Sequence, residues 1–290
     1  MHPTIRLAAL AVLSAALVSA PRPAQAETYQ TCAGFIDSLP ATISTQGTWC
    51  LRGDLSTAMT SGAAITIAAN NITIDCNDFK LGGLAAGDGT ATTGILAENR
   101  INATVRNCNV RGFKSGTDLN GSGHAVLDSK FDSNTYTGIA VTGEGTLVQG
   151  NRVNDTGGSP GAPFGGFGIA VAAEVAVIRD NFIQGVFALP GGNGAVYGVH
   201  AFLVGGSIEG NIVASLQADG TGQVYGIDTR SFVLDSSHLV IRDNVVSLGA
   251  MVPVTGRGVS CEGAIVRDNT VSGATTAFHG CVDAGGNFSN

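Results

Sequence analysis

The chain has 290 residues and a formal net charge of −7, with 15 Lys and Arg residues against 22 Asp and Glu. This acidic balance disfavours a general nucleic-acid binder or a protein of anionic membrane surfaces, although it leaves room for a locally positive cleft. The 42 glycines, the many Val, Ile, Asn and Thr residues and the lack of a Leu-rich amphipathic stretch argue against helices.

The first 26 residues have the pattern of a secretory signal peptide. A basic start at Arg6 precedes an apolar run from Leu7 to Val18 and a small-residue AQA sequence that ends at Ala26. The run is short for a membrane span, and a retained anchor is the alternative. We expect removal of residues 1–26, which takes the formal charge from −7 to −9 through the loss of Arg6 and Arg22. The mature chain is then exported, as a periplasmic, secreted or cell-surface protein with no membrane span.

Six cysteines in an exported chain predict disulfides. Many connectivities are open in principle, and proximity in the sequence favours Cys32–Cys50, Cys76–Cys108 and Cys261–Cys281. The first pair would staple an N-terminal cap, residues 27–61. Free buried thiols are the alternative for Cys76 and Cys108.

A six-residue unit recurs along the chain, as in IRDNFI at residue 178. Its copies begin at residues 74, 105, 126, 148, 178, 208, 241 and 266. The first and sixth positions are apolar, and the fourth is Asn except at Cys108 and Ser129. Because Asn tolerates the left-handed backbone region and hydrogen-bonds locally, we expect it to form a sharp turn. Asparagines stacked about 4.8 Å apart would also form a hydrogen-bonded ladder.

A second motif, Gly followed by Ile or Val, precedes most copies by about ten residues, as in GIAVT at residue 138 and GVHAF at residue 198. Its alternation of apolar and other residues is typical of a half-buried strand. Each unit is therefore predicted as strand, bend, strand, Asn turn, short strand and a variable Gly-rich loop. Such a unit cannot bury its apolar side alone, so consecutive units must stack and share a core.

This repeat resembles the right-handed parallel β-helix proteins of the pectate lyase superfamily, over residues 62–284 and about eight coils. The segment ITIAANNITIDCNDFKLGG resembles the first coil of such proteins. The resemblance implies an all-β, single-stranded right-handed parallel β-helix, a solenoid behind the disulfide-stapled cap, with residues 285–290 as a tail. A left-handed hexapeptide helix is the alternative fold, but it would need a steadier period of roughly 18 residues. The fold hosts lyases, hydrolases, epimerases, tailspikes and adhesins, so it does not specify an activity.

The repeated Arg-Asp-Asn sequence is interpreted as scaffold. The resemblance implies that this turn lies between the second and third strands of a coil, away from the usual active face. The second position of the unit also mixes charge signs, as a solvated face with local ion pairs would. Its residues are Asp75, Arg106, Leu127, Gln149, Arg179, Glu209, Arg242 and Arg267.

The strand that opens each coil holds the candidate site, because in enzymes of this fold the catalytic groups sit on its outer face. One outward column contains Leu96, Ala140, Ala170, His200, Asp228, Ser260 and His279. A parallel column contains Glu98, Thr142, Ala172, Phe202, Arg230 and Glu262. Both columns are mainly small and apolar toward the N-terminus and polar toward the C-terminus, so we expect a site in the C-terminal half.

Asp228 and Glu262 would have α-carbons roughly 8 Å apart on the diagonal between neighbouring coils. A carboxylate pair with such a gap suits inverting glycoside hydrolysis. Arg230 would bind a uronate carboxylate or keep Glu262 ionised, and His200 or His279 would transfer protons. In a lyase, a base would instead remove the proton beside a uronate carboxylate, and a cation would stabilise the intermediate.

The loops at residues 157–167, 185–197, 215–225 and 247–257 fall at one corner and would form a wall beside the opening strands. Their aromatic residues Phe164, Phe187, Tyr197 and Tyr225 would stack on sugar rings, and Phe202 and Ser260 would add substrate contacts. Alternatively, Phe167, Tyr197 and Tyr225 stack on one another and close the corner.

Other chemistries have less support. Asp228, Arg230 and Glu262 also fit a plain surface ion-pair cluster. A serine triad needs His between the acid and Ser, whereas Asp228 falls directly beside Ser260. The sequence FHGC only half matches the Gly-His-Gly of polygalacturonases, and their Asp-Asp and Arg-x-Lys motifs are missing.

No cofactor is expected. A calcium site has thin support, because only Asp228 and Glu262 fall close together, and no Cys/His spacing indicates zinc. The sequence thus predicts an exported protein that binds or cleaves a polysaccharide or cell-surface glycan, and not nucleic acid, along the opening strands. Whether it is an enzyme stays open, and the alternative is a non-catalytic adhesion or structural scaffold.

Overall fold

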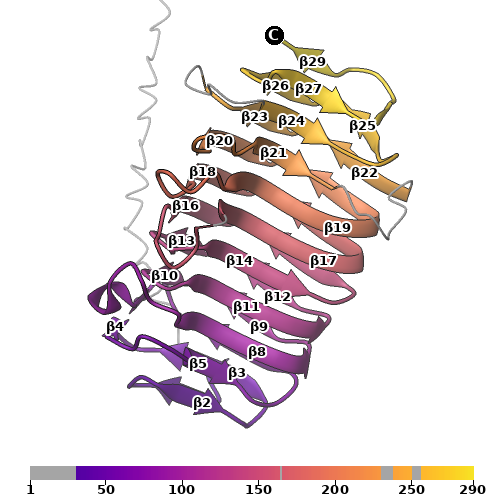
Figure 1. The fold of residues 1–290 in the computed structure, drawn as a ribbon. Helices are drawn as coiled ribbons and strands as arrows, with labels where there is room; N and C mark the ends of the chain where they lie inside the picture. Colours follow the sequence, from indigo (N-terminus) through magenta and orange to yellow (C-terminus); the bar gives the residue numbers. More distant parts are fainter. Residues whose placement is uncertain (1–30, 164, 230–237, 250–255) are drawn as a thin grey trace, which may run out of the picture.

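The computed structural model describes residues 31–163, 165–229, 238–249 and 256–290. Within them the chain winds as a stack of coils (Figure 1). Each coil contributes strands to three faces, and the strands within a face run parallel to one another. The predicted signal peptide and Arg230 lie outside the described residues. The arrangement is the predicted parallel β-helix.

The first face consists of the strands that open the coils. They are β2 (Ala41–Ile43), β5 (Ala63–Ile67), β8 (Thr93–Ile101), β11 (Ser115–Ser122), β14 (Thr137–Thr142), the first part of β17 (Gly165–Arg179), the first part of β19 (Ala195–Glu209), β21 (Val224–Asp228), β24 (Gly256–Ser260) and β27 (Thr276–His279). Each pairs in parallel with the opening strand of the next coil, as β19 does with β21.

The second face follows the bend of each coil. It contains β3 (Gly47–Leu51), β6 (Ile72–Asp75), β9 (Thr104–Arg106), β12 (Ala125–Leu127), β15 (Thr146–Gln149), the later parts of β17 and β19, β22 (His238–Arg242), β25 (Ile265–Arg267) and β28 (Val282–Asp283), and β1 (Gly34–Ile36) pairs with β3. The strands β17 and β19 run through the bend without a break, which joins the first two faces into one hydrogen-bonded sheet.

The third face is a separate ten-stranded sheet. Its strands are β4 (Leu55–Ser56), β7 (Lys80–Gly82), β10 (Asn109–Arg111), β13 (Lys130–Asp132), β16 (Arg152–Gly157), β18 (Phe182–Phe187), β20 (Ile212–Gln217), β23 (Val245–Ser247), β26 (Thr270–Ser272) and β29 (Phe288–Ser289). A single turn of 3-10 helix, η2 (Leu84–Ala86), follows β7.

The predicted cap and tail both contribute strands to these faces. In residues 27–61, β2 pairs with β5 and β3 pairs with β6. In residues 285–290, β29 pairs with β26. The third face therefore counts more turns than the predicted eight or so, because each end of the chain adds paired strands to the stack.

Apolar side chains stack inside the solenoid in columns, one from each face. Ile169, Val199 and Ile227 from the first face are fully buried, as are Ile178 and Ile208 from the second. Alternation along each strand sends their neighbours outward. The repeated apolar positions form one continuous core. Full burial of each such side chain contributes roughly 1.5–3 kcal/mol to the stability of the fold.

The glycine of the GIAVT-type motif, which is present in the seven first-face strands from β8 to β24, is required by close packing across the coil. A Cβ on Gly198 would lie 2.3 Å from Val213 Cγ1 of the third face and 2.6 Å from the Gly226 carbonyl oxygen of the next coil. Gly168 and Gly226 have equivalent close contacts. The Gly in the GIAVT-type motif therefore lets the first face approach the third.

The predicted asparagine ladder is present on the inner side of the turns. Asn181 donates from Nδ2 to Asn211 Oδ1 at 2.9 Å, and Asn211 donates to Asn244 Oδ1 at 3.0 Å. The same oxygen of Asn211 also accepts the Asn181 backbone N–H. The ladder runs through Asn151, Asn181, Asn211, Asn244, Asn269 and Asn287.

The backbone role expected of the Asn belongs instead to the residue before it in most turns. Asp180, Asp243 and Asp268 have φ values of 56°, 56° and 54°. Asn181, by contrast, is 1% exposed and has a negative φ. The turn therefore separates two tasks: the third position adopts the left-handed conformation, and the fourth supplies the buried amide.

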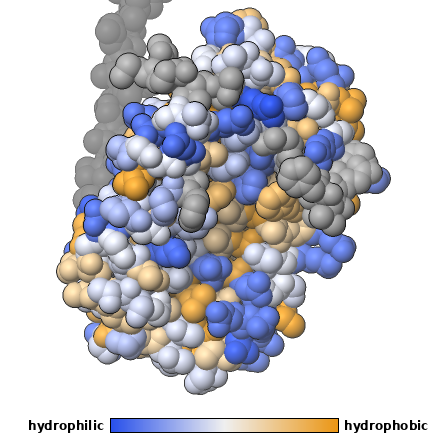
Figure 2. Space-filling view, in the orientation of Figure 1, coloured by the Kyte–Doolittle hydropathy of each residue, from blue (hydrophilic) through white to orange (hydrophobic). Residues whose placement is uncertain are grey.

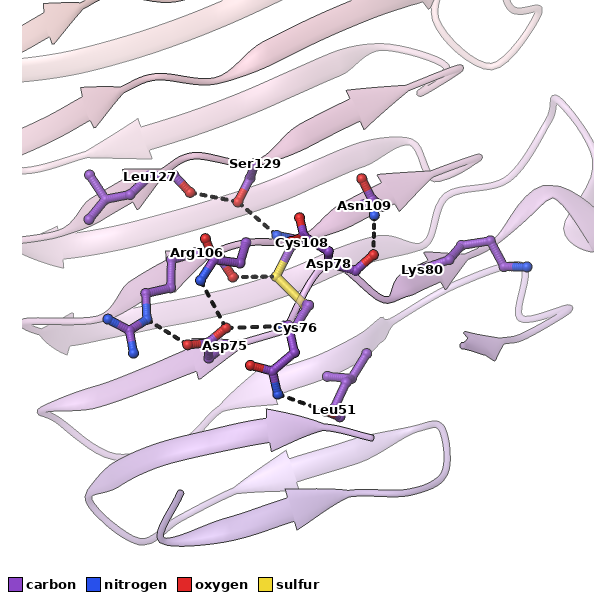
Figure 3. Close-up of a disulfide and its surroundings, with 12 residues drawn as sticks. Leu51, Asp75, Cys76, Asp78, Lys80, Arg106, Cys108, Asn109, Leu127 and Ser129 are labelled. Carbon is purple, nitrogen blue, oxygen red and sulfur yellow. Dashed lines mark hydrogen bonds and ion pairs between the residues drawn. A yellow bond between two sulfur atoms is a disulfide. The ribbon is translucent and has the colours of Figure 1, made fainter. Parts of the chain in front are cut away.

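A polar substitute continues the ladder at one of the two positions where the Asn is replaced (Figure 3). Ser129 Oγ accepts the Cys108 backbone N–H at 3.1 Å and donates to the Leu127 carbonyl at 2.7 Å. Cys108 itself forms a disulfide with Cys76 of the preceding coil. Ser129 thus takes over the acceptor role of the Asn, whereas at Cys108 the disulfide interrupts the ladder and the Cys76 backbone N–H donates to the Arg106 carbonyl.

The three disulfides are the predicted ones, Cys32–Cys50, Cys76–Cys108 and Cys261–Cys281. The second position of the repeated unit is a solvated face with local pairs. Arg106 Nε lies 2.8 Å from Asp75 Oδ2, and Arg242 pairs with Glu209. Within the Arg-Asp-Asn copies themselves, Arg242 pairs with Glu209, and Arg179 donates to Gln149 Oε1 at 2.9 Å.

Candidate functional site

The outward residues at the C-terminal end of the first face form one row across neighbouring strands. In register, His200 of β19 pairs with Asp228 of β21, Asp228 with Ser260 of β24, and Ser260 with His279 of β27. The row therefore brings together four of the predicted site residues, although 79 positions separate its ends in the sequence.

His200 and Asp228 form the closest pair in this row. His200 Nδ1 lies 3.3 Å from Asp228 Oδ2, an ion-pair distance if the imidazole is protonated. The Asp228 side chain is 2% exposed and that of His200 is 17% exposed. Nδ1 has no hydrogen bond with acceptable geometry among the described residues, so the pairing is electrostatic in this structure.

Aromatic rings hold His200 in place. Its ring centroid lies 4.5 Å from that of Tyr197, 5.4 Å from that of Phe167 and 4.4 Å from that of Phe202. Phe202 is edge-on to the imidazole and lies two residues further along β19. The imidazole is thus fixed between apolar faces, with one nitrogen turned toward Asp228.

Ser260 and His279 continue the row in different environments. Ser260 is completely buried, and its Oγ has no hydrogen-bond partner among the described residues. His279 is exposed at the end of β27. Because Asp228 lies between His200 and Ser260, the register has the order that does not build a serine triad.

The second predicted column is only partly described. Phe202 pairs in register with Ala172. Glu262 lies in a bend two residues beyond the end of β24 and is exposed. Arg230 and Phe164 lie outside the described residues. The two members of the predicted acid–base pair therefore differ in environment: Asp228 is buried within β21, whereas Glu262 is exposed beyond the end of β24.

The aromatic residues at the corner stack on one another. Tyr197 lies parallel to Phe167 and to Tyr225, with ring centroids 4.9 Å apart in both cases. Tyr136 contacts Phe167 edge-on, and the Arg257 guanidinium lies 5.9 Å from the Tyr225 centroid. The stack is the arrangement offered above as the alternative to sugar stacking, and Tyr225 is only 4% exposed.

Sequence reasoning missed a carboxyl on the same face. Asp118 of β11 pairs with Leu96 and with Ala140, so it belongs to the first outward column. A coil was expected between the motifs at 94 and 138, but its opening strand was not assigned, because Thr117 takes the inward position that is Ile or Val elsewhere. The Thr117 Oγ1 donates to the Ile95 carbonyl at 3.1 Å. The Gly-Thr at residues 116–117, midway between the motifs at 94 and 138, was the available signal.

Asp118 lies beside a second carboxyl at a small surface cavity. The cavity has a volume of about 380 Å³ and is lined by Leu96, Ala97, Glu98, Asn99, Asp118 and Asn120. Burial, and to a lesser degree the nearby Glu98 carboxylate, raises the pKa of Asp118 above its usual range. The raised pKa of Asp118 and its place at a surface cavity make it a further candidate for acid–base chemistry on this face.

A comparison with known protein families identifies the architecture. Residues 93–290 match the family described as right handed beta helix region. The chain belongs to this family. No curated protein matches the chain.

Several solved structures are similar to this chain. The Dettilon tailspike protein (gp208) matches with a TM-score of 0.56 and 14% identity, over 88% of this chain and 60% of that one. The pectate lyase Pel9A has a TM-score of 0.44, 12% identity and coverage of 89% and 69%. The tailspike protein of E. coli bacteriophage HK620 in complex with pentasaccharide has a TM-score of 0.43, 10% identity and coverage of 90% and 60%. The β-helix thus spans about 60% of the length of the Dettilon tailspike.

Among the described residues of the β-helix, no three His, Cys, Asp or Glu side chains are grouped to hold a metal ion. Across the same ranges, no helix is long and apolar enough to cross a membrane.

Proposed function

We propose that this β-helix is an exported protein that binds a polysaccharide along its first face, with the row from His200 to His279 as the main contact. The observation that carries the proposal is the burial of Asp228 and Ser260 on the outer face of their strands. Burial of a carboxyl or of an unpartnered hydroxyl is costly. The same column holds Ala at positions 140 and 170, so the scaffold itself does not require polar groups there.

A linear polymer suits the shape of this surface. Figure 2 shows the first face hollowed along its middle, with hydrophobic residues at mid-height and hydrophilic residues above and below. The row crosses successive strands about 4.8 Å apart, with the partly exposed His200 at one end, the exposed His279 at the other and the buried Asp228 and Ser260 between them. His200 and Phe202 add ring edges and faces on which a sugar can pack.

The more specific form of the proposal is that the protein cleaves the polysaccharide that it binds. Asp228 and Glu262 act as the two carboxyl groups of a hydrolase, one protonating the leaving oxygen and the other activating water. Arg230 binds an acidic group of the substrate, and His200 positions Asp228 or moves a proton. Tyr197 and Ser260 complete the contacts. In a lyase, the same groups take a proton next to a uronate carboxylate instead.

The test combines glycan binding with product analysis. The purified protein is screened for affinity against neutral and acidic polysaccharides, and bound glycans are then incubated and assayed for reducing ends and unsaturated products. Asp228→Asn and Glu262→Gln keep the shape of the side chains and remove their charge. Glu144→Gln, on an exposed turn elsewhere, is the matched control.

Each result decides between the hypotheses. Loss of product formation in Asp228→Asn and Glu262→Gln, with Glu144→Gln active and all melting temperatures close to wild type, supports the hydrolase or lyase. Binding that weakens in Asp228→Asn, without product in the wild type, supports a binding module. A wild-type protein that binds no glycan overturns the proposal and leaves the adhesion or structural scaffold.

A further inference from the structure

The third face carries a groove that the first-face site does not use. Its cavity has a volume of about 460 Å³ and lies over β7, β10, β13 and β16. The lining residues are Lys80, Asn109, Val110, Arg111, Lys130, Asp132, Arg152 and Asn154. The groove thus gathers four cationic side chains and one carboxylate on a chain whose formal net charge is −7.

The strand register assembles these cations into two columns. Lys80, Asn109, Lys130 and Arg152 face outward in register on consecutive strands. Arg111 lies two residues along β10 from Asn109, between Gly82 and Asp132. Figure 3 shows Lys80 and Asn109 on the opposite side of the Cys76–Cys108 disulfide from Arg106.

Two of the four cations have no carboxylate partner among the described residues. Lys80 Nζ lies 3.2 Å from Asp54, and Arg111 lies 3.1 Å from Asp132. Lys130 forms no ion pair there, and the Arg152 guanidinium lies over the Phe182 ring, 4.8 Å from its centroid. Lys130 and Arg152 are neighbours in register, so their uncompensated charges lie side by side.

The groove is bounded in a way that favours a short ligand. Its lining is mainly the carbon stems of the long outward side chains, since Val110 between them is fully buried in the core. Beyond Arg152 the same column continues with Phe182, Ile212 and Val245, so the positive charge is confined to the N-terminal half of the face. Such a pocket, with apolar stems and a few convergent charges, is typical of a ligand site.

We propose that this groove binds an acidic oligosaccharide, with Lys130 and Arg152 as the main contacts to its anionic groups. The sugar rings lie on the carbon stems, and the guanidinium and ammonium groups donate charge-assisted hydrogen bonds. An extended polyanion fits less well, because the rest of this acidic chain repels it beyond the groove. The site is separate from the first-face row and does not depend on it.

The test measures the affinity of the full protein for defined oligosaccharides by titration calorimetry. The probes are an oligogalacturonate hexamer, which carries carboxylates, a heparin hexasaccharide, which adds sulfates, and neutral maltohexaose. We expect at least one acidic probe to bind, with an affinity that falls as salt rises, and maltohexaose not to bind. The Lys130→Gln, Arg152→Gln double variant is expected to bind at least about ten-fold more weakly.

Two controls separate this site from others. Arg267→Gln removes an exposed cation from the second face and is expected to bind like wild type. Asp228→Asn tests independence from the proposed first-face function: the weakening caused by Lys130→Gln with Arg152→Gln is expected to be equally large in the Asp228→Asn background and in wild type. Melting temperatures of all variants are compared, so that a loss of fold is recognised.

Three outcomes would overturn the proposal: no binding of either acidic probe, equal binding of the neutral probe, or unchanged binding by the folded double variant. A DNA oligonucleotide or an anionic lipid vesicle that binds the groove more tightly than both acidic sugars would also overturn it. The class of ligand would then be a different one.

Discussion

Asn181 and Asn211 are 30 residues apart in the sequence and joined by a buried hydrogen bond from Nδ2 to Oδ1 of 2.9 Å. Asn211 Nδ2 in turn donates to Asn244 Oδ1 and to the Ile178 carbonyl oxygen. Every amide in the middle of the ladder thus satisfies groups of two coils. This coupling predicts that one interior Asn stabilises more than its own turn.

Asn211→Ala is expected to destabilise the protein by on the order of 3 kcal/mol, because it removes the acceptor of the Asn181 backbone N–H and of one of the two bonds that Asn181 Nδ2 donates, which leaves only the bond to the Val148 carbonyl. Urea unfolding followed by circular dichroism measures the loss. Asn154→Ala, a half-buried outward position on the third face, is the control and is expected to change stability by less than about 0.5 kcal/mol. Similar losses in the two variants would contradict the role of the ladder.

Gly198, the glycine of a GIAVT-type motif, is expected to tolerate no side chain, because it packs closely against the third face and the next coil. Gly198→Ala would bring a Cβ to 2.3 Å from Val213 Cγ1 and 2.6 Å from the Gly226 oxygen. The clash includes backbone, so we expect a loss of about 3 kcal/mol or more, at the upper end of overpacking effects. Gly53→Ala, with no atom within 4 Å of the new Cβ, is the control. If both variants unfold at the same urea concentration, the packing argument fails.

The Cys76–Cys108 disulfide is expected to stabilise the first coils. It closes a loop with a sequence separation of 32 residues, for which loop entropy contributes about 3–4 kcal/mol. Cys76→Ala combined with Cys108→Ala should lower the free energy of unfolding by at least this amount, since both residues are buried. Equilibrium unfolding of the double variant and of the wild type, with and without reductant, provides the measurement. An unchanged midpoint in the double variant would refute the expectation.

Asp118 predicts a dependence of stability on pH. Its pKa is raised in the folded protein, first by burial and then by Glu98. The folded state therefore holds this proton more tightly than the unfolded state does. The stabilisation is present below the unfolded pKa near 3.8 and is lost as pH rises through the folded value.

Asn does not ionise, so Asp118→Asn avoids the loss of stability that wild type undergoes when Asp118 gives up its proton. We therefore expect the variant to be more stable than wild type at pH 7 and to differ little from it at pH 3. Thermal unfolding at both pH values measures the difference. Glu144→Gln, which replaces an exposed carboxylate, serves as the control. A gain of equal size at both pH values would show that the effect comes from packing rather than from the proton.

Local sequence signals determined the architecture because each coil repeats the same physical requirements. Apolar positions with a period of two indicate half-buried strands, and Asn at the fourth position indicates a turn whose amide must be satisfied. The disulfide pairs were predicted for a related reason, since cysteines in adjacent coils come together once the units stack. Where a coil used a different inward residue, as at Thr117, the pattern failed and Asp118 was overlooked.

The repeated motif already predicted that His200 and Asp228 share one outward column, and the strand register agrees. Only the tertiary structure showed that Lys80, Lys130 and Arg152 align on the third face, because no sequence motif marks the register of those strands. Burial is likewise a property of the assembled coils: Asp228 and Ser260 are polar positions in sequence but lie below the surface in the fold. The sequence by itself determined the repeating unit and its core, and the contacts between units decided where charge and polar groups gather.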